Sequence, residues 1–349
     1  MTLFNELQQQ MEAAPNSTEP LEGFEQVAEA MEITVSHDTQ GDWLFQLKNS
    51  EKPAALRVSA DYQRLEKHLN GVPEEEVEKF RFLLRTAFEC RFCYEGIISL
   101  HAACVVLDGF AVAFTGHSGM GKSTRAKAWV DGLGATFISG DRPAVRLEKN
   151  GSTACGVPWD GKEQIFCDME APLKCIMEVR RSPDNYIRKL SGDQARQLLA
   201  QQTFIPMWDT DAAVCALANA RRLTRQTPIY RVFCGPTEED AKVIYDILMH
   251  HPEQIKEERT DMKIKKGFVL RNVVDEYMVM PTGENIAKFE GTAVLNEVSA
   301  FVFKQLENGI SREDLLTAML AEFDVDEATA ARDLDALLAQ FRELGLLED

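Results

Sequence analysis

The chain has 349 residues, of which 45% are hydrophobic and 27% are charged. These fractions are typical of globular proteins, so they exclude a fully disordered or fibrous chain. The length corresponds to about two or three domains. The 56 acidic and 38 basic side chains give a formal charge of −18. Such a charge repels polyanions, so neither nucleic acid nor an anionic membrane is the expected partner.

The start of the chain lacks the basic residues and apolar core of a secretory signal, and no apolar run approaches the roughly 18 residues of a membrane span. We therefore expect a cytoplasmic protein whose eight cysteines are reduced. Cys90 and Cys93 form one C-x-x-C pair. Because no second pair or histidine completes a zinc site, buried structural thiols are favoured over metal or redox chemistry.

Residues 1–92 have the pattern of an α+β region without a chemical motif, and the sequence leaves its role open. Residues 1–30 are polar with sparse apolar positions, which indicates a short helix followed by a loop. Beyond them, apolar–polar alternation predicts strands, and an apolar face at helical spacing predicts one helix. The strands are expected at 33–35, 43–47 and 55–58 and the helix at 74–92.

An apolar run at 97–106 predicts a buried strand, and Asp108-Gly109 behind it is typical of a tight hairpin. The return strand at 111–115 leads into a complete match to the phosphate-binding loop G-x-x-x-x-G-K-[ST]. The glycines let N–H groups turn toward phosphate oxygens, and the following helix adds its positive end. A purely structural glycine turn would leave Lys122 unexplained. The predicted nucleotide-binding residues are Gly116, His117, Ser118, Gly119, Met120, Gly121, Lys122, Ser123 and Thr124.

A magnesium ion needs oxygen ligands in addition to phosphate. The Ser123 hydroxyl is one candidate, and Asp141, at the end of a short apolar strand at 137–141, is the other. Consecutive β-α-β geometry would bring this strand end beside the phosphates, where Asp141 is a metal ligand or a base. The alternative is an acid in a surface turn. Pairing across the hairpin also places His101 near Gly116, as a functional histidine or as an ordinary core residue.

The rest of the chain predicts a further mixed region, a linker and a separate C-terminal unit. Residues 150–250 are expected to contain strands at 175–179, 213–217 and 229–233 and helices at 193–202 and 238–249. The charged segment 250–266 is interpreted as a linker. The C-terminal unit is predicted to contain two strands, at 268–274 and 277–281, followed by three helices. The helices are expected at 296–307, from Ser311 onward, and at 326–344, and Ser311 with Asp314 forms an imperfect capping box. Together these elements would form a winged-helix-like module.

The hairpin before the phosphate loop resembles the HPr serine kinase and ATP-type phosphoenolpyruvate carboxykinase superfamily. The similar residues fall within about 95–235 and comprise Leu100-His101-Ala102-Ala103, Phe114 to Thr124, Ser139-Gly140-Asp141-Arg142-Pro143 and Gly156-Val157-Pro158-Trp159-Asp160-Gly161-Lys162. The resemblance implies an α/β (α+β) phosphate-loop core, ATP and Mg²⁺ as cofactors, and His101, Lys122 and Asp141 as catalytic residues.

This chain departs from the HPr kinases at one position. Those kinases have two adjacent acids where Gly140-Asp141 stands here, and the first acid is the one usually given the role of base. His101 or Asp141 would then have to deprotonate or orient the acceptor hydroxyl. Phosphoryl transfer depends mainly on positioning and charge neutralisation, so the missing acid need not abolish it.

Residues 263–349 resemble the PqqD-like peptide-recognition domains of pathways for ribosomally made, modified peptides. This resemblance is carried by the two strands, the three helices and the C-terminal sequence Phe341-Arg342-Glu343-Leu344-Gly345-Leu346-Leu347. From Met262 to Asp349 there are 9 Lys and Arg against 17 Asp and Glu, a net charge of −8. A winged helix that reads DNA has a basic face, whereas strand addition of a peptide to the hairpin edge needs none. Peptide recognition is therefore favoured over DNA binding and over a simple docking module.

Together these patterns predict a kinase that transfers the γ-phosphoryl group of Mg·ATP to a Ser or Thr hydroxyl of a precursor peptide, whose leader the C-terminal domain holds. Lys162 and Arg180 or Arg181 are candidates for a second cation. The alternatives are an ATPase or small-molecule phosphotransferase and a non-catalytic nucleotide-binding regulator. The peptide, its acceptor residue, the choice of ATP or GTP and the oligomeric state stay open. The expected domains are 1–92, 93–250 and 263–349, with a linker at 251–262.

Overall fold

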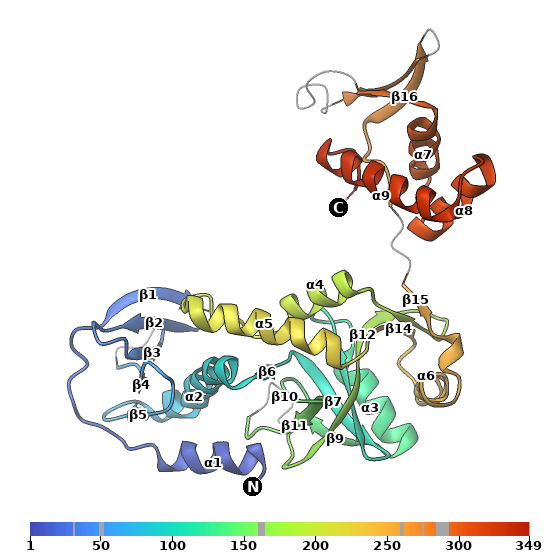
Figure 1. Cartoon of the computed structure of the whole chain (residues 1–349). Helices are drawn as coiled ribbons and strands as arrows, with labels where there is room; N and C mark the ends of the chain where they lie inside the picture. The colour runs from blue at the N-terminus through green and yellow to red at the C-terminus, as the bar shows by residue number, and fades with distance from the viewer. Residues whose placement is uncertain are drawn as a thin grey trace. The chain divides into compact units, whose positions relative to one another are not determined.

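The computed structural model describes residues 1–30, 32–48, 52–159, 165–258, 262–273, 276–283 and 293–348. The chain divides into two compact units, Met1–Glu258 and Arg259–Asp349 (Figure 1). Residues 1–92 belong to the first unit, and the boundary expected at 92/93 stays a prediction. Part of the expected linker also belongs to the first unit, because strand β15 (Lys256–Glu257) pairs with β13 (Tyr186–Lys189). No helix in the described ranges is both long and apolar enough to span a bilayer.

The N-terminal part of the first unit is an antiparallel sheet with two helices. Its five strands lie in sequence order, and the long helix α2 packs against β3 and β4. The predicted helices and strands are confirmed, but the predicted loop contains β1, and β5 was not predicted. Strand β1 has mostly exposed side chains and lacks the apolar alternation by which strands are recognised. The elements are α1 (Leu3–Ala13), β1 (Glu25–Ala30), β2 (Ile33–His37), β3 (Trp43–Leu47), β4 (Ala55–Val58), β5 (Leu65–His68) and α2 (Glu74–Glu95).

The apolar run at 97–106 is not the single strand that its pattern predicts. It contains β6 (Ile97–Ser99) and β7 (Ala102–Leu107), which have different partners. Strand β6 pairs with β10 (Ala144–Glu148), whereas β7 pairs with β8 (Phe110–Thr115) and β9 (Thr136–Ser139). The break lies at Leu100–His101, where the backbone N–H groups donate to the carbonyls of Pro143 and Gln202. The change of partner places His101 at the junction of two arms of the sheet.

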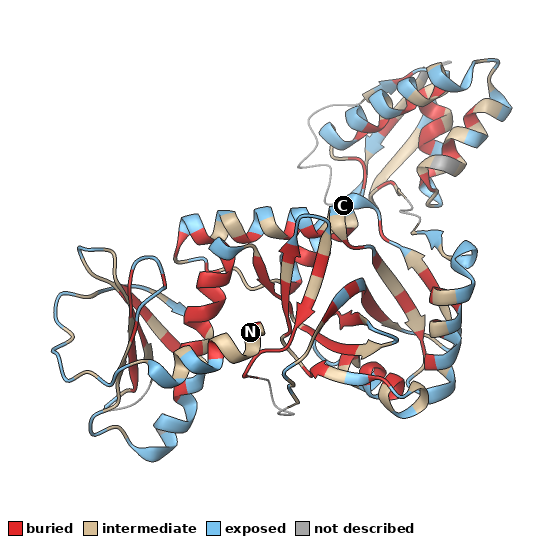
Figure 2. Ribbon diagram, turned by 60° about the horizontal axis from the view of Figure 1, so that its bottom comes forward, coloured by how far each residue is buried: buried red, intermediate tan, exposed pale blue. Residues whose placement is uncertain are grey.

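The central sheet is covered by helices on both faces (Figures 1 and 2). Along β8, Val112 and Phe114 join the core formed with α3 and α6, whereas Ala111 and Ala113 join the core formed with α4 and α5. Strands buried on both faces read as continuous apolar runs, which explains why β8 is visible in the sequence. In β12 and β14 the apolar residues are interrupted by charged side chains such as Glu178 and Arg231. Strand β12 pairs in parallel with both β8 and β14. The further elements are α3 (Lys122–Leu133), β11 (Gly151–Cys155), β12 (Glu170–Arg181), α4 (Gly192–Gln202), α5 (Thr210–Gln226), β14 (Ile229–Cys234), α6 (Glu238–His250) and the short η1 (Pro252–Gln254).

The strand predicted at 213–217 is wrong, because these residues lie inside helix α5. Asp209 caps the helix by accepting a hydrogen bond from the backbone N–H of Ala212 at 3.0 Å. The buried positions of α5 follow helical spacing, and Val214 within the apolar run is 61% exposed. The helices predicted at 193–202 and 238–249 are confirmed as α4 and α6.

The second unit combines a three-stranded antiparallel sheet with three helices. The two predicted strands and three predicted helices are confirmed, and β18 is an addition. The Ser311 hydroxyl caps α8 by accepting from the Asp314 N–H at 3.1 Å, as the capping pattern predicts. Residues 274 and 275, between the two predicted strands, lie outside the described residues, and the winged-helix similarity stays a prediction. The elements are β16 (Phe268–Val273), β17 (Glu276–Pro281), β18 (Ala293–Leu295), α7 (Glu297–Glu307), α8 (Arg312–Glu322) and α9 (Glu327–Glu343).

Candidate functional site

The predicted phosphate-binding loop joins the end of β8 to the start of α3. Gly121 has φ 89°, ψ 35° and stands immediately before the helix. A side chain at Gly121 would also collide with the guanidinium of Arg125. Glycine is therefore needed there for two reasons, the left-handed backbone and the close approach of Arg125. The observed strand, loop and helix order is the context that the motif requires.

Lys122 folds back across this loop, and its Nζ donates a hydrogen bond to the Gly116 carbonyl at 3.1 Å. The lysine is only 9% exposed. Burial lowers the pKa of its ammonium, and the nearby Asp141 carboxylate partly opposes that shift. A buried ammonium with one carbonyl partner is well suited to a phosphate anion, which would supply the missing negative charge.

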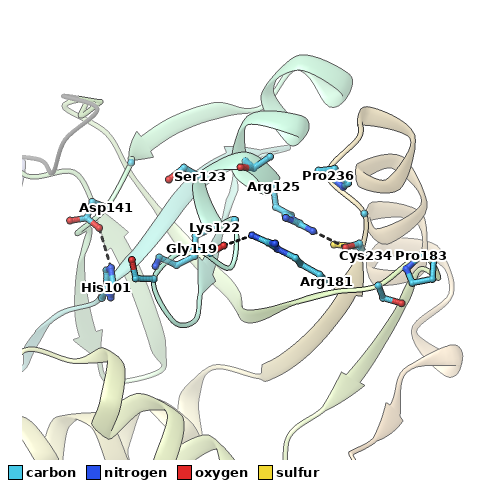
Figure 3. Close-up of a pocket in the computed structure, with 16 residues that line it drawn as sticks. His101, Gly119, Lys122, Ser123, Arg125, Asp141, Arg181, Pro183, Cys234 and Pro236 are labelled. Carbon is cyan, nitrogen blue, oxygen red and sulfur yellow. Dashed lines mark hydrogen bonds and ion pairs between the residues drawn. The ribbon is translucent and has the colours of Figure 1, made fainter.

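His101 and Asp141 point toward one another at the same edge of the sheet (Figure 3). His101 Nε2 lies 3.3 Å from Asp141 Oδ1, and the two side chains are 31% and 32% exposed. The hydrogen bond from His101 is the main reason that the pKa of Asp141 is lowered. Strand β7 lies between β8 and β9 and is antiparallel to both, so the carboxyl ends of β8 and β9 meet at one edge. This arrangement confirms the expected placement of Asp141 beside the loop.

A cavity of about 1000 Å³ brings most of the predicted site residues together. Its other wall is formed by Ser182-Pro183 and Cys234-Gly235-Pro236, which the sequence did not single out. Of the predicted loop residues, Gly116, His117 and Met120 do not line it. The predicted residues that line it are His101, Ser118, Gly119, Gly121, Lys122, Ser123, Thr124, Asp141 and Arg181.

The same cavity has oxygen donors suited to a magnesium ion. The Ser123 hydroxyl and the Asp141 carboxylate both line it. No group of three or more His, Cys, Asp or Glu side chains that could hold a metal occurs among the described residues. Mg²⁺ prefers oxygen ligands and is commonly bound by one or two protein groups together with substrate phosphates. These two residues therefore fit a nucleotide-bound magnesium ion better than an ion held by protein alone.

The three candidates for a second cation have different positions. Arg181 Nη2 donates to the Gly119 carbonyl at 2.5 Å and lines the cavity (Figure 3). Arg180 instead pairs with the buried Glu178 carboxylate at 2.6 Å and is not among the lining residues. Lys162 lies outside the described residues.

Two further residues, Arg125 and Glu178, lie against the loop, and no sequence pattern predicted either of them. Arg125 Nη2 donates to the Cys234 carbonyl at 2.9 Å, which ties the first turn of α3 to the end of β14. Glu178 is 3% exposed and lies opposite Thr115 in the parallel pair of β8 and β12, directly behind Gly116. It accepts from Arg231 Nε at 2.8 Å. The signal available in the sequence was a charged residue at a position with otherwise apolar neighbours.

One cysteine, Cys234, lines the cavity and accepts a hydrogen bond from Arg125 through its carbonyl oxygen. None of the eight is in a disulfide, and Cys90 and Cys93 are buried. Burial raises the pKa of Cys90 and raises that of Cys93 to about 12, so both thiols are protonated near neutral pH. This state is consistent with the expected structural role.

Comparison with known families identifies the C-terminal part of the chain. Residues 276–347 match the family described as coenzyme PQQ synthesis protein D (PqqD). The second unit therefore contains a PqqD domain, which confirms the resemblance expected for the C-terminal residues. The comparison with curated proteins gave no match.

Three solved structures are among those similar to parts of the chain. TbiB1 in complex with the TbiA(beta) leader peptide is 28% identical, with 25% of this chain and 94% of that chain covered and a TM-score of 0.22. Lasso peptide synthetase B1 complexed with the leader peptide is 19% identical, with coverages of 26% and 100% and a TM-score of 0.23. The HPr(Ser) kinase/phosphatase from Coxiella burnetii is 13% identical, with coverages of 44% and 96% and a TM-score of 0.26.

Proposed function

We propose that this protein is a Mg·ATP-dependent kinase that phosphorylates a Ser or Thr hydroxyl of a ribosomally made precursor peptide. The observation that carries the proposal is the shared cavity, onto which both the phosphate-binding loop with Lys122 and the His101–Asp141 pair open. Phosphoryl transfer needs phosphate binding, neutralisation of charge and a positioned hydroxyl. The residues of this cavity can supply all three.

In this proposal the loop N–H groups and Lys122 hold the β and γ phosphates. Ser123 and Oδ2 of Asp141, which lies 3.9 Å from Arg142 Nε, would hold Mg²⁺, which would offset the charge that develops on the transferred group. The acceptor oxygen attacks the γ phosphorus, and the bond from that phosphorus to the leaving ADP oxygen breaks.

The proposed role of His101 follows from its contact with Asp141. His101 Nε2 faces the carboxylate, so in the neutral ring the proton on Nε2 donates to Asp141. Nδ1 is then the atom left to orient the acceptor hydroxyl and to receive its proton. His101 would then act as the base, a role that the glycine at position 140 cannot perform.

The PqqD domain is proposed to hold the leader of the peptide. Strand β17 pairs with both β16 and β18, so within the described residues β16 has one edge without a partner strand. An extended peptide can add to such an edge through main-chain hydrogen bonds. The net charge of −8 from Met262 to Asp349 disfavours DNA as the ligand. Tethering the leader would raise the local concentration of the remaining peptide at the nucleotide site.

Gly140 in place of a second acid keeps two other functions open. An ATPase or small-molecule phosphotransferase would use the same loop without a peptide acceptor, and a regulator would bind nucleotide without turnover. The deciding experiment incubates the protein with Mg·ATP and candidate precursor peptides and measures by mass spectrometry a gain of about 80 Da, one phosphoryl group, on the peptide. ADP formation without modified peptide would support the ATPase, and binding without turnover would support the regulator.

Lys122→Ala is the matched loss-of-function variant, and Lys127→Ala, exposed on the same helix, is its control. Loss of turnover in the first variant only would tie the activity to the loop. Unchanged turnover in Lys122→Ala would refute the assignment of the loop.

A further inference from the structure

A second cavity, of about 500 Å³, shares His101 with the nucleotide cavity. Its walls come mainly from β1, from helix α2 and from the segment 201–208, which begins in the last turn of α4. These parts of the chain include the N-terminal region to which the sequence assigned no role. Its volume is within the range of about 300–1000 Å³ that is usual for ligand pockets. His101 therefore lines two cavities, and only the first of them is also lined by the phosphate-binding loop.

The inner part of the second cavity carries two guanidinium groups around one buried carboxylate. Glu89 is 2% exposed and accepts from the Ser99 hydroxyl at 2.6 Å. Arg85 Nε and Arg142 Nη1 lie 3.7 and 3.8 Å from the two oxygens of Glu89. Each guanidinium has five N–H donors, so one carboxylate at these distances leaves donors for a ligand.

Both arginines are held in place. The Arg85 guanidinium stacks on the Phe82 ring at 4.7 Å, and its buried Nε has no hydrogen-bond partner within the described part of the chain. Arg142 Nε lies 3.9 Å from Asp141 Oδ2, which links this wall to the His101–Asp141 pair. A stacked, ion-paired guanidinium is a preorganised donor for carbonyl oxygens.

The outer part of the cavity is apolar and exposed. Met207 is 80% exposed and Val27 is 44% exposed, and Phe82 and Phe204 also line the wall. Large apolar side chains that gather at the mouth of a cavity indicate a binding surface. Methionine is unbranched and adapts to different apolar partners. This surface suits an apolar side chain of a ligand whose polar part reaches the arginines.

We propose that the second cavity binds the segment of the peptide that carries the acceptor hydroxyl. The hydroxyl would lie at His101, a neighbouring apolar side chain would pack against Val27 and Met207, and main-chain carbonyls would accept from Arg85 and Arg142. The inference rests on the proposed kinase function. It adds that the kinase would be specific for a Ser or Thr that stands next to a bulky apolar residue in the peptide. A peptide is favoured as the occupant because the cavity adjoins the nucleotide site and combines guanidinium donors for main-chain carbonyls with an apolar wall. The hydroxyl and the phosphate would then approach His101 from different cavities.

Photo-crosslinking of the full chain tests this assignment without turnover. The probe is the peptide acetyl-Ala-Ser-(p-benzoylphenylalanine)-Ala-amide, with Mg²⁺ and a non-hydrolysable ATP analogue. After irradiation and digestion, mass spectrometry should locate the label within 201–208 or 27–30. Met207→Glu should reduce this label about tenfold, since a charge there removes the apolar contact. Val214→Glu is the control, because Val214 is similarly exposed at 61% but lies on α5 and does not line the cavity.

Several outcomes would overturn the assignment. They are a label scattered over the surface, a label on the second unit only, and a label that Met207→Glu leaves unchanged. Labelling that falls as the protein concentration rises would mean that a second copy of the chain covers the cavity, which would also refute it.

The crosslink separates this inference from the proposed function. The peptide could be crosslinked in the cavity and yet gain no mass of about 80 Da, one phosphoryl group, when incubated with Mg·ATP. That result would refute the kinase function and support the peptide-binding site. Conversely, peptide phosphorylation with the same KM in Met207→Glu and in the unchanged protein would support the kinase and refute the acceptor cavity. If both inferences hold, the KM for the peptide rises about tenfold in Met207→Glu, whereas the Kd for the ATP analogue does not change.

Discussion

His101 Nε2 lies 3.3 Å from Asp141 Oδ1, although the two residues follow different strands of the central sheet. The contact forms because β7 begins directly after His101 and lies beside β9, whose end leads to Asp141. The Ala102 N–H also donates to the Asp141 carbonyl at 2.8 Å. The relative position of His101 and Asp141 is therefore fixed by a backbone hydrogen bond in addition to the side-chain contact. Asp141 therefore contacts the histidine through Oδ1, while Oδ2, the oxygen proposed to contact a metal ion, lies 3.9 Å from Arg142 Nε.

We predict that Asp141→Asn lowers stability at neutral pH but not in acid. The hydrogen bond from His101 lowers the pKa of Asp141 below its ordinary value, so folding favours the ionised carboxylate. The resulting stability is fully present above the unfolded pKa of about 3.9 and is lost as the pH falls through the lower folded value. The half-exposed site limits the effect to about 0.5–1 kcal/mol.

The measurement is urea unfolding at pH 7 and near pH 3, followed by tryptophan fluorescence. All four tryptophans lie in the first unit, so the signal reports on the unit that contains Asp141. Asp131→Asn, exposed on α3, is the control and should change stability by less than about 0.5 kcal/mol. An Asp141→Asn deficit of the same size at both pH values would contradict the prediction.

His101→Gln should reduce phosphoryl transfer while nucleotide binding is kept. Glutamine can still donate to Asp141, but its amide cannot accept the proton of the acceptor hydroxyl. General-base catalysis contributes about 100-fold or more in many enzymes, but phosphoryl transfer depends less on it, so we expect kcat to fall by about 10- to 100-fold. The comparison is kcat from peptide phosphorylation with the Kd for ATP. His250→Gln, which removes an exposed histidine paired with Asp246, should change neither quantity. A fall in ATP affinity that accounts for the whole loss would assign His101 to nucleotide binding instead.

The features that the sequence predicts correctly are local. The strand, loop and helix order around Gly116–Ser123, the Asp108-Gly109 hairpin and the helix capped by Ser311 each depend on residues adjacent in the chain. Two of the errors arise where tertiary packing, and not the local sequence, decides the structure. The run at 97–106 is uniformly apolar, and nothing in its hydrophobicity marks the change of partner strand at His101. Residues 213–217 read as a strand because Val214 and Leu217 are apolar, although both are exposed on helix α5.

The residues that support the site could not be predicted for a similar reason. Arg125 donates a hydrogen bond to the Cys234 carbonyl, and Glu178 forms an ion pair with Arg231. These partners are distant in sequence and become neighbours only when β8, β12 and β14 align. The acceptor cavity likewise needs residues from the N-terminal sheet, from α2 and from the segment after α4. Such relationships are defined by topology, which hydrophobic periodicity does not encode.

Glu178→Gln should destabilise the first unit strongly. The buried carboxylate accepts from Arg180 at 2.6 Å and from Arg231 at 2.8 Å, and Arg231 also pairs with Glu258 at 2.7 Å. In Glu178→Gln, Arg180 loses its carboxylate partner while Arg231 keeps Glu258. We expect a cost of about 3 kcal/mol, the lower end for breaking a buried pair, because both guanidinium groups are partly exposed. Urea unfolding followed by tryptophan fluorescence measures the loss. The matched control is Glu239→Gln, whose exposed pair with Lys242 at 2.6 Å should contribute under about 0.5 kcal/mol. Equal losses in the two variants would show that the network behind Gly116 does not stabilise the fold.

Gly121→Ala and Gly134→Ala separate backbone strain from side-chain collision at the two ends of α3. Both glycines are left-handed, with φ of 89° and 76°. Alanine in that conformation costs about 1–2 kcal/mol at either position. At Gly134 an added Cβ meets nothing within 4 Å, whereas at Gly121 it collides with Arg125. Arg125 cannot move away freely, because it is 6% exposed and donates to the Cys234 carbonyl.

We therefore expect Gly121→Ala to lose about 1 kcal/mol more than Gly134→Ala, the value of the displaced hydrogen bond. Because the collision also reshapes the loop, ATP affinity should fall at least about tenfold in Gly121→Ala and stay unchanged in Gly134→Ala. Chemical denaturation gives the stabilities, and titration with a fluorescent ATP analogue gives the affinities. If both variants kept the original ATP affinity, the contact between Gly121 and Arg125 would have no part in shaping the nucleotide site. If both lost it equally, the cause would be a general weakening of α3 and not the collision at its first turn.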